Sequence, residues 1–117
     1  MLLPAKPTEF LDRLNDETED DPELNPFWAE LWPTSLRLAK LVCEGDWSEN
    51  THAIELGCGI GVVGLAALTA GLDVVFTDCV ELAVKTAVEN AHRNGFMNAS
   101  GSIVDWRQPT EQKASLL

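Results

Sequence analysis

Apolar residues along the second half of this chain alternate between short runs and helical stripes. Short apolar runs predict buried strands at 51–56, 73–77 and 101–104. Stripes with helical spacing predict helices at 34–43, 62–70 and 81–94. Thr34 or Ser35 is available to cap the first helix. Gly45, Gly71 and Gly95 each stand just past a predicted helix, where glycine takes the left-handed conformation at no steric cost.

The order of these elements predicts the fold class and the domain layout. Strands that alternate with helices at this spacing are parallel and are joined by right-handed crossovers, with helices covering the sheet. We therefore expect an α/β fold, a doubly wound parallel sheet that stops after its third strand. Residues 26–117 form one small domain. Residues 1–25 are expected to be an acidic, disordered arm, because carboxylates dominate 12–23 and few apolar groups offset the entropy of ordering.

Composition narrows the classes of function. The 8 Lys and Arg residues against 19 Asp and Glu give a net charge of −11, so nucleic acid is not expected as a partner. Cys43, Cys58 and Cys79 form no paired pattern, which predicts reduced, mostly buried thiols and neither a disulfide framework nor a metal site. No run approaches the roughly 18 to 20 apolar residues of a membrane span, and the start lacks a signal peptide pattern, so we expect a soluble, cytoplasmic protein.

A glycine-rich turn joins the first predicted strand to its helix. Residues 55–65 read ELGCGIGVVGL and place Gly57, Gly59, Gly61 and Gly64 where a backbone approaches a ligand closely. A side chain at Gly59 or Gly61 is expected to occupy the space of that ligand. The free N–H groups at the helix start favour a phosphate or a carboxylate equally. Residues 59–64 also satisfy the dinucleotide pattern G-x-G-x-x-G, so a nucleotide such as NAD stays open at this point.

Three acidic residues close consecutive predicted strands, at the sheet edge where open α/β folds bind ligands. Glu55 beside the loop would repel a pyrophosphate but suits a ligand that carries cations. Asp78 is placed to accept hydrogen bonds from ribose hydroxyls, although a helix cap is the alternative for it. Asp105 ends the third strand, and the neighbouring Trp106 could cover an adenine face, with a surface turn as the alternative.

At these residues the sequence resembles the class I, seven-strand, Rossmann-like methyltransferases that use S-adenosylmethionine, through ELGCGIG, VVFTD and IVDW. The segment PFWAELWPTSLRLAKLV resembles one branch of that family, the protein lysine methyltransferases that include the enzyme acting on the electron-transfer flavoprotein beta subunit. The resemblance implies Trp32 against the cofactor, Glu55, Gly57 and Gly59 at the methionine moiety, Asp78 on the ribose, and Asp105 with Trp106 at the adenine. Trp28 and Trp32 could equally be core residues that cover the end of the sheet.

The function that follows is a methyltransferase, with N-methylation of a protein lysine implied by the resemblance. In the family a fourth strand lies beside the first and the acceptor-binding residues follow it, so we expect this chain to be the cofactor-binding half alone, with an uncovered sheet edge. A non-catalytic module that binds the cofactor or a partner protein is the first alternative, and a fragment of an NAD-binding oxidoreductase is the second. The sequence leaves the oligomeric state and the catalytic residues open.

Overall fold

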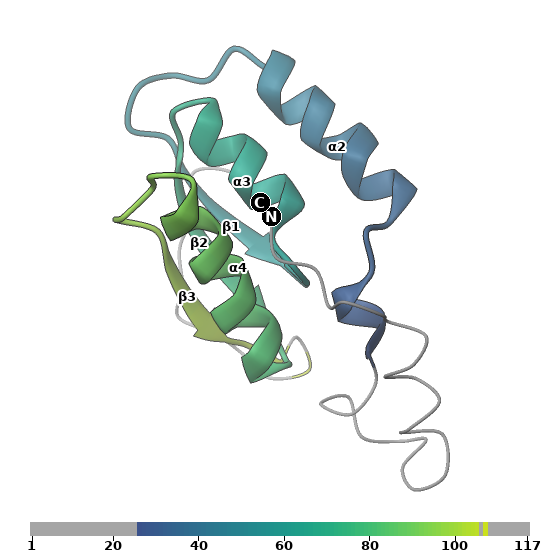
Figure 1. Cartoon of the computed structure of the whole chain (residues 1–117). Helices are drawn as coiled ribbons and strands as arrows, with labels where there is room; N and C mark the ends of the chain where they lie inside the picture. Colours follow the sequence, from purple (N-terminus) through teal and green to yellow (C-terminus); the bar gives the residue numbers. More distant parts are fainter. Residues whose placement is uncertain (1–25, 106, 108–117) are drawn as a thin grey trace, which may run out of the picture.

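Three parallel strands form the sheet in the part of the chain that the structure describes. The computed structural model describes residues 26–105 and 107. Strands β1 (His52–Leu56), β2 (Asp73–Asp78) and β3 (Ser100–Ile103) pair in the order β1-β2-β3 (Figure 1). The register sets Glu55 beside Phe76 and Asp78 beside Ile103. The predicted parallel α/β architecture is therefore confirmed, and the carboxyl ends of all three strands meet at one edge.

Helices α3 and α4 lie on one face of this sheet. The helical segments are η1 (Pro26–Ala29), α2 (Pro33–Glu44), α3 (Val62–Thr69) and α4 (Glu81–Arg93). Helix α3 follows β1 and α4 follows β2, while α2 packs along α3 on the side away from α4 (Figure 1). The described residues thus contain one of the two helical layers of a doubly wound sheet. Within these residues no helix is both long and apolar enough to cross a membrane.

The ends of α2 differ from the prediction. Its N-cap is Trp32, without a side-chain cap, and Pro33 opens the helix, where its missing N–H costs nothing. Gly45 is extended, with φ −67° and ψ 151°, so the predicted left-handed cap is wrong. A Cβ at Gly45 would approach the Trp47 ring to 2.6 Å. That ring donates from Nε1 to the carbonyl of Val42 at 2.8 Å, and this contact is what requires a glycine here.

The other predicted helix ends and the cysteines gave mixed outcomes. Gly71 and Gly95 have φ of +93° and +90°, as the sequence predicted. Of the three cysteines only Cys58 is buried, whereas Cys43 and Cys79 are exposed, so the expectation of mostly buried thiols is wrong. Cys43 lies on α2 and Cys79 directly follows β2. The acidic arm predicted for 1–25 lies outside the described residues.

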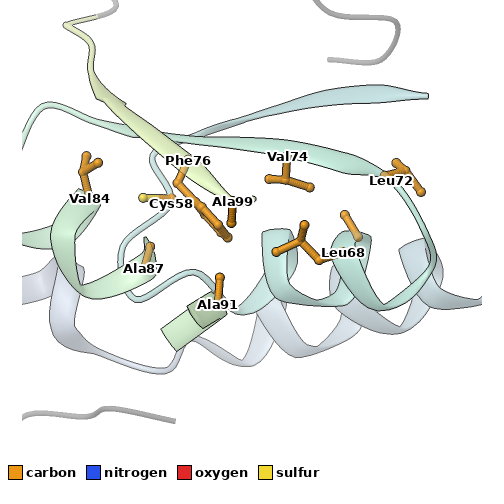
Figure 2. Close-up of a cluster of buried hydrophobic side chains, with 10 residues drawn as sticks. Cys58, Leu68, Leu72, Val74, Phe76, Val84, Ala87, Ala91 and Ala99 are labelled. Atoms are coloured by element: carbon orange, nitrogen blue, oxygen red, sulfur yellow. The ribbon is translucent and has the colours of Figure 1, made fainter. Parts of the chain in front are cut away.

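The core fills the space between the sheet and helices α3 and α4. Phe76 of β2 is fully buried in this core and belongs to the same cluster as Leu68 of α3 and Ala87 of α4 (Figure 2). Burying a phenylalanine side chain stabilises a fold by about 1.5 to 3 kcal/mol. Helix α4 can approach β3 closely because Gly101 has no side chain: a Cβ there would overlap Val84. The position of α4 over the sheet therefore depends on Gly101.

We predict that Gly101→Ala destabilises the protein, because the added methyl group must displace Val84 and with it α4. Overpacking of this kind costs about 1 to 3 kcal/mol. Urea unfolding followed by circular dichroism measures the loss. Ser100→Ala is the matched control, since Ser100 is an exposed residue of the same strand and its substitution should change stability by less than about 0.5 kcal/mol. Equal stability of the two variants would contradict the packing described above.

Candidate functional site

The loop from Gly57 to Gly61 forms the centre of the candidate site. Gly59 and Gly61 have φ of +52° and +88°, a conformation that favours glycine. A Cβ at Gly59 would lie 2.7 Å from the carbonyl oxygen of Trp28, and one at Gly61 would lie 2.8 Å from the Cβ of Ala87. These glycines therefore have a packing reason, because η1 and α4 lie directly against the loop, and the expected reason, space for a ligand, stays a prediction.

Main-chain hydrogen bonds tie this loop to the end of β2. The N–H of Cys58 donates to the carbonyl of Thr77 at 2.9 Å, which extends the ladder between β1 and β2 by one step. The N–H of Gly61 donates to the carbonyl of Cys58 at 2.8 Å and closes a tight turn. The hydroxyl of Thr77 donates to the carbonyl of Glu55 at 2.6 Å. The loop therefore has one defined conformation at the carboxyl edge of the sheet.

Asp78 ends β2 and faces this loop. It is 7% exposed, and its Oδ2 accepts the N–H of Gly59 at 3.0 Å while Oδ1 accepts the N–H of Val80 at 3.0 Å. Val80 precedes α4, and that helix has no side-chain cap. Asp78 is thus a support for the loop more than a helix cap. Each carboxylate oxygen has a second lone pair, so both can still accept from a ligand.

Glu55 reaches from β1 to the first turn of α3. Its Oε2 accepts the N–H of Gly64 at 2.8 Å, one of the amides that a helix start leaves without an intrahelical partner. The pKa of Glu55 is raised to about 8. Burial is the main cause, the bond from Gly64 partly opposes the rise, and the negative charge of Asp78 adds to it. In the ligand-free protein Glu55 therefore carries its proton over much of the neutral range.

A cavity of about 100 Å³ lies between this loop, η1 and the start of α2. Five of the eight predicted site residues line it, namely Trp32, Glu55, Gly57, Gly59 and Asp78. Trp32 is 45% exposed, so it lies at the surface of the site and is not a core residue. The structure brings together the predicted residues from the first two strands, with Trp32 from the segment before α2.

Three predicted site residues are not among those lining the cavity. Gly61 is buried against Ala87 and the Phe76 ring. Asp105 follows β3, but Arg107 holds its carboxylate through Nε at 2.9 Å and a shorter bond of 2.6 Å from the terminal nitrogen. Hydrogen bonds from Arg107 lower the pKa of Asp105 to about 2. Trp106 lies outside the described residues, so its predicted role at an adenine stays a prediction.

Sequence reasoning missed two residues of η1 and its surroundings. Glu30 lines the cavity and adds a third carboxylate to those of Glu55 and Asp78, while no Lys or Arg is among the described residues that line it. Trp28 also lines the cavity, and its indole Nε1 is buried and has no hydrogen-bond partner among the described residues. The segment FWAELW contains both residues, but it is mostly apolar, so the sequence did not indicate that Glu30 and the N–H of Trp28 belong to the site. Only the fold brings η1 against the loop.

A further missed residue supports the loop from behind. Asn90 of α4 is fully buried, and its Nδ2 donates to the carbonyl of Ile60 at 2.8 Å. The two residues are 30 positions apart in the chain. The sequence offered one signal, an asparagine among the alanines of the apolar stripe of α4. A buried amide there requires a partner from another element.

Known proteins match this chain in sequence and in structure. Residues 34–117 match the family "Ribosomal protein L11 methyltransferase (PrmA)". A ribosomal protein L11 methyltransferase of Campylobacter jejuni subsp. jejuni is 42% identical over 44 residues, which cover 38% of this chain and 16% of that protein. The crystal structure of ribosomal protein L11 methylase from Lactobacillus delbrueckii subsp. bulgaricus superposes with a TM-score of 0.52 and 27% identity, covering 59% of this chain and 36% of the other.

A more distant structure shares the fold. Coclaurine N-methyltransferase, in a crystal structure bound to N-methylheliamine and SAH, superposes with a TM-score of 0.54 at 19% identity and covers 86% of this chain and 30% of its own. The aligned region therefore spans about a sixth of the Campylobacter relative and about a third of each of the two structures. Because the family match extends over most of the sequence, the chain belongs to the ribosomal protein L11 methyltransferase (PrmA) family.

Proposed function

We propose that this chain supplies the S-adenosylmethionine-binding part of a class I methyltransferase. The observation that carries the proposal is the set of three carboxylates, Glu30, Glu55 and Asp78, around a glycine loop with no basic side chain among the described lining residues. Such a site favours a ligand with positive charge. S-adenosylmethionine has a sulfonium and an ammonium, and family membership supports the same ligand.

The remaining polar groups of the site fit this cofactor. Its ammonium would lie near Glu55, which regains its charge when a cation approaches. Its ribose hydroxyls would donate hydrogen bonds to the carboxylate of Asp78, whose oxygens each have a second lone pair. Its carboxylate requires donors, and the buried indole N–H of Trp28 is a donor that has no partner within residues 26–105 and 107. Trp32 would cover the ligand from the surface side. Asp105, released from Arg107, and Trp106 complete the proposed set at the adenine.

The alternative of an NAD-binding oxidoreductase is disfavoured by the same charges. A pyrophosphate in this cavity would face the three carboxylates without a compensating Lys or Arg among the described lining residues. A dinucleotide loop instead presents free amides to the phosphates. Here the N–H groups of Gly59, Gly61 and Gly64 are already donated within the protein. The glycine pattern therefore serves a different ligand.

The acceptor of the methyl group is proposed to be the amino group of a protein lysine. The names of the relatives indicate a ribosomal protein as the substrate of those enzymes, and the segment PFWAELWP supports the lysine methyltransferase branch named above. Bound S-adenosylmethionine supplies a methyl group activated by its sulfonium. The residues of this chain would hold and orient the cofactor, and we assign no base among them. A module that binds the cofactor without turnover is distinguished by assaying methylation of lysate proteins.

We predict that isothermal titration calorimetry detects binding of S-adenosylmethionine and that Asp78→Asn weakens it about 10- to 100-fold. The charged acceptor for the ribose hydroxyls is lost, and such hydrogen bonds contribute about 1.5 to 3 kcal/mol. Asp73→Asn makes the same chemical change at the other end of β2 and should bind as the unaltered protein does. Absence of heat with the unaltered protein, or tighter binding of NAD, would sink the proposal.

We predict that the stability of the ligand-free protein decreases between about pH 5 and pH 8 and that Glu55→Gln removes much of this decrease. The folded-state pKa of about 8 exceeds the ordinary value of 4.5, so the protonated form is favoured by folding. This contribution is complete below pH 4.5 and is lost as the pH rises through 8. One such proton changes stability by about 1.4 kcal/mol per pH unit at most.

Chemical denaturation at several pH values measures this dependence. Glu49→Gln is the control, because Glu49 is exposed in a turn and its substitution should leave the pH profile of stability unchanged. Identical profiles for Glu55→Gln and the unaltered protein would show that the carboxyl of Glu55 is already ionised at neutral pH, contrary to the burial described for it.

A further inference from the structure

One peptide unit of the loop, between Ile60 and Gly61, is held at both ends. Its carbonyl oxygen accepts the Nδ2–H of Asn90 at 2.8 Å. Its N–H donates to the carbonyl of Cys58 at 2.8 Å. The two groups of a planar peptide point in opposite directions and turn together. Rotation of this unit would therefore break both hydrogen bonds at once.

Gly61 can adopt the backbone dihedral angles that this rotation requires. Gly61 has φ of +88° and no Cβ, and glycine populates positive and negative φ about equally. The dihedral angles of Gly61 therefore do not by themselves prevent the peptide from turning over. Ile60 lines the cavity, so a turned peptide would change which backbone groups face the ligand. The bond from Asn90 acts against that alternative conformation.

Because Asn90 is buried, its hydrogen bond to Ile60 can be separated from its role in packing. Asn90 is completely buried in α4, where an apolar side chain would satisfy the packing but would leave the carbonyl of Ile60 without this donor. Asn90 is not among the residues that line the cavity, whereas Ile60 is, so the effect of Asn90 on a ligand through this hydrogen bond would be indirect. Its amide thus serves the loop and not the ligand directly.

We propose that Asn90 is a positioning residue, which fixes the peptide between Ile60 and Gly61 and thereby sets the ligand affinity of the loop from α4. The proposal rests on the proposed function only for the identity of the ligand. The geometry of the loop in the ligand-free protein is a separate consequence, and it can be measured without any ligand.

The first test is amide hydrogen exchange of the ligand-free protein, measured by NMR. Asn90→Leu has nearly the same size and lacks the donor, and we expect the amide of Gly61 to exchange roughly tenfold faster, as loss of one hydrogen bond implies. The amide of Cys58, which donates to Thr77, is the internal reference and should change less. Asn94→Ala is the control variant, because Asn94 bonds only the end of α4, at the carbonyl of Asn90, and leaves the loop untouched.

The second test uses Asn90→Asp, whose carboxyl group can donate to Ile60 only when it is protonated. We expect the affinity of this variant for S-adenosylmethionine, divided by that of the unaltered protein at each pH, to fall about tenfold as the pH rises. Glu55 titrates in both proteins, so its effect is largely removed by the division, whereas burial raises the pKa of the Cys58 thiol so far that it stays protonated throughout. A residue that served stability alone would lower the melting temperature without a pH-dependent affinity ratio. If Asn90→Leu does not fold, the pH dependence of the affinity ratio of Asn90→Asp tests the positioning role by itself.

The outcomes separate the two proposals. Unchanged exchange at Gly61 together with an affinity ratio that is constant with pH would overturn the role of Asn90. Faster exchange at Gly61 in a protein that never binds S-adenosylmethionine would leave the positioning role intact and refute the proposed function instead.

Discussion

The close approach of α3 to the sheet at Gly64 is the constraint on which the rest of the site depends. A Cβ at this position would overlap both the Phe76 ring and the carboxylate of Glu55. Because Gly64 has none, the first turn of α3 can lie against the core on one side and receive Glu55 on the other. The N–H of Gly64 lies in the first turn and has no intrahelical partner, and the carboxylate of Glu55 accepts its hydrogen bond instead. One missing side chain thus couples core packing to the position of a candidate ligand group.

The loop itself is held by side chains from neighbouring elements. Asp78 at the end of β2 accepts from Gly59, and Asn90 in α4 donates to Ile60. Both side chains are buried, so these bonds replace contacts that water would otherwise make. A glycine-rich segment has high conformational entropy when free. Its single conformation here is therefore a property of the assembled fold and not of the loop sequence.

This dependence explains which parts of the structure could be predicted from the sequence. The strands, the helices and the left-handed Gly71 and Gly95 follow from local pattern, and the ends of the strands then place Glu55 and Asp78 at one edge. The local pattern could not show that η1 lies against Gly59, because that contact joins segments about 30 residues apart. For the same reason the sequence did not reveal the roles of Glu30 and Asn90. The wrong prediction for Gly45 has a different reason: the contact is local, since the ring of Trp47 and not a left-handed cap requires a glycine there.

The electrostatics of the site explain how three carboxylates can share one small cavity in a chain of net charge −11. Full ionisation of all three would place like charges together in a partly buried space, which is unfavourable. The raised pKa of Glu55 removes one of these charges while the site holds no cation. A positively charged ligand reverses the balance, because its approach favours the ionised carboxylate and releases the proton. The fold thus avoids most of the repulsion in the ligand-free state, and the attraction develops only when a cation enters.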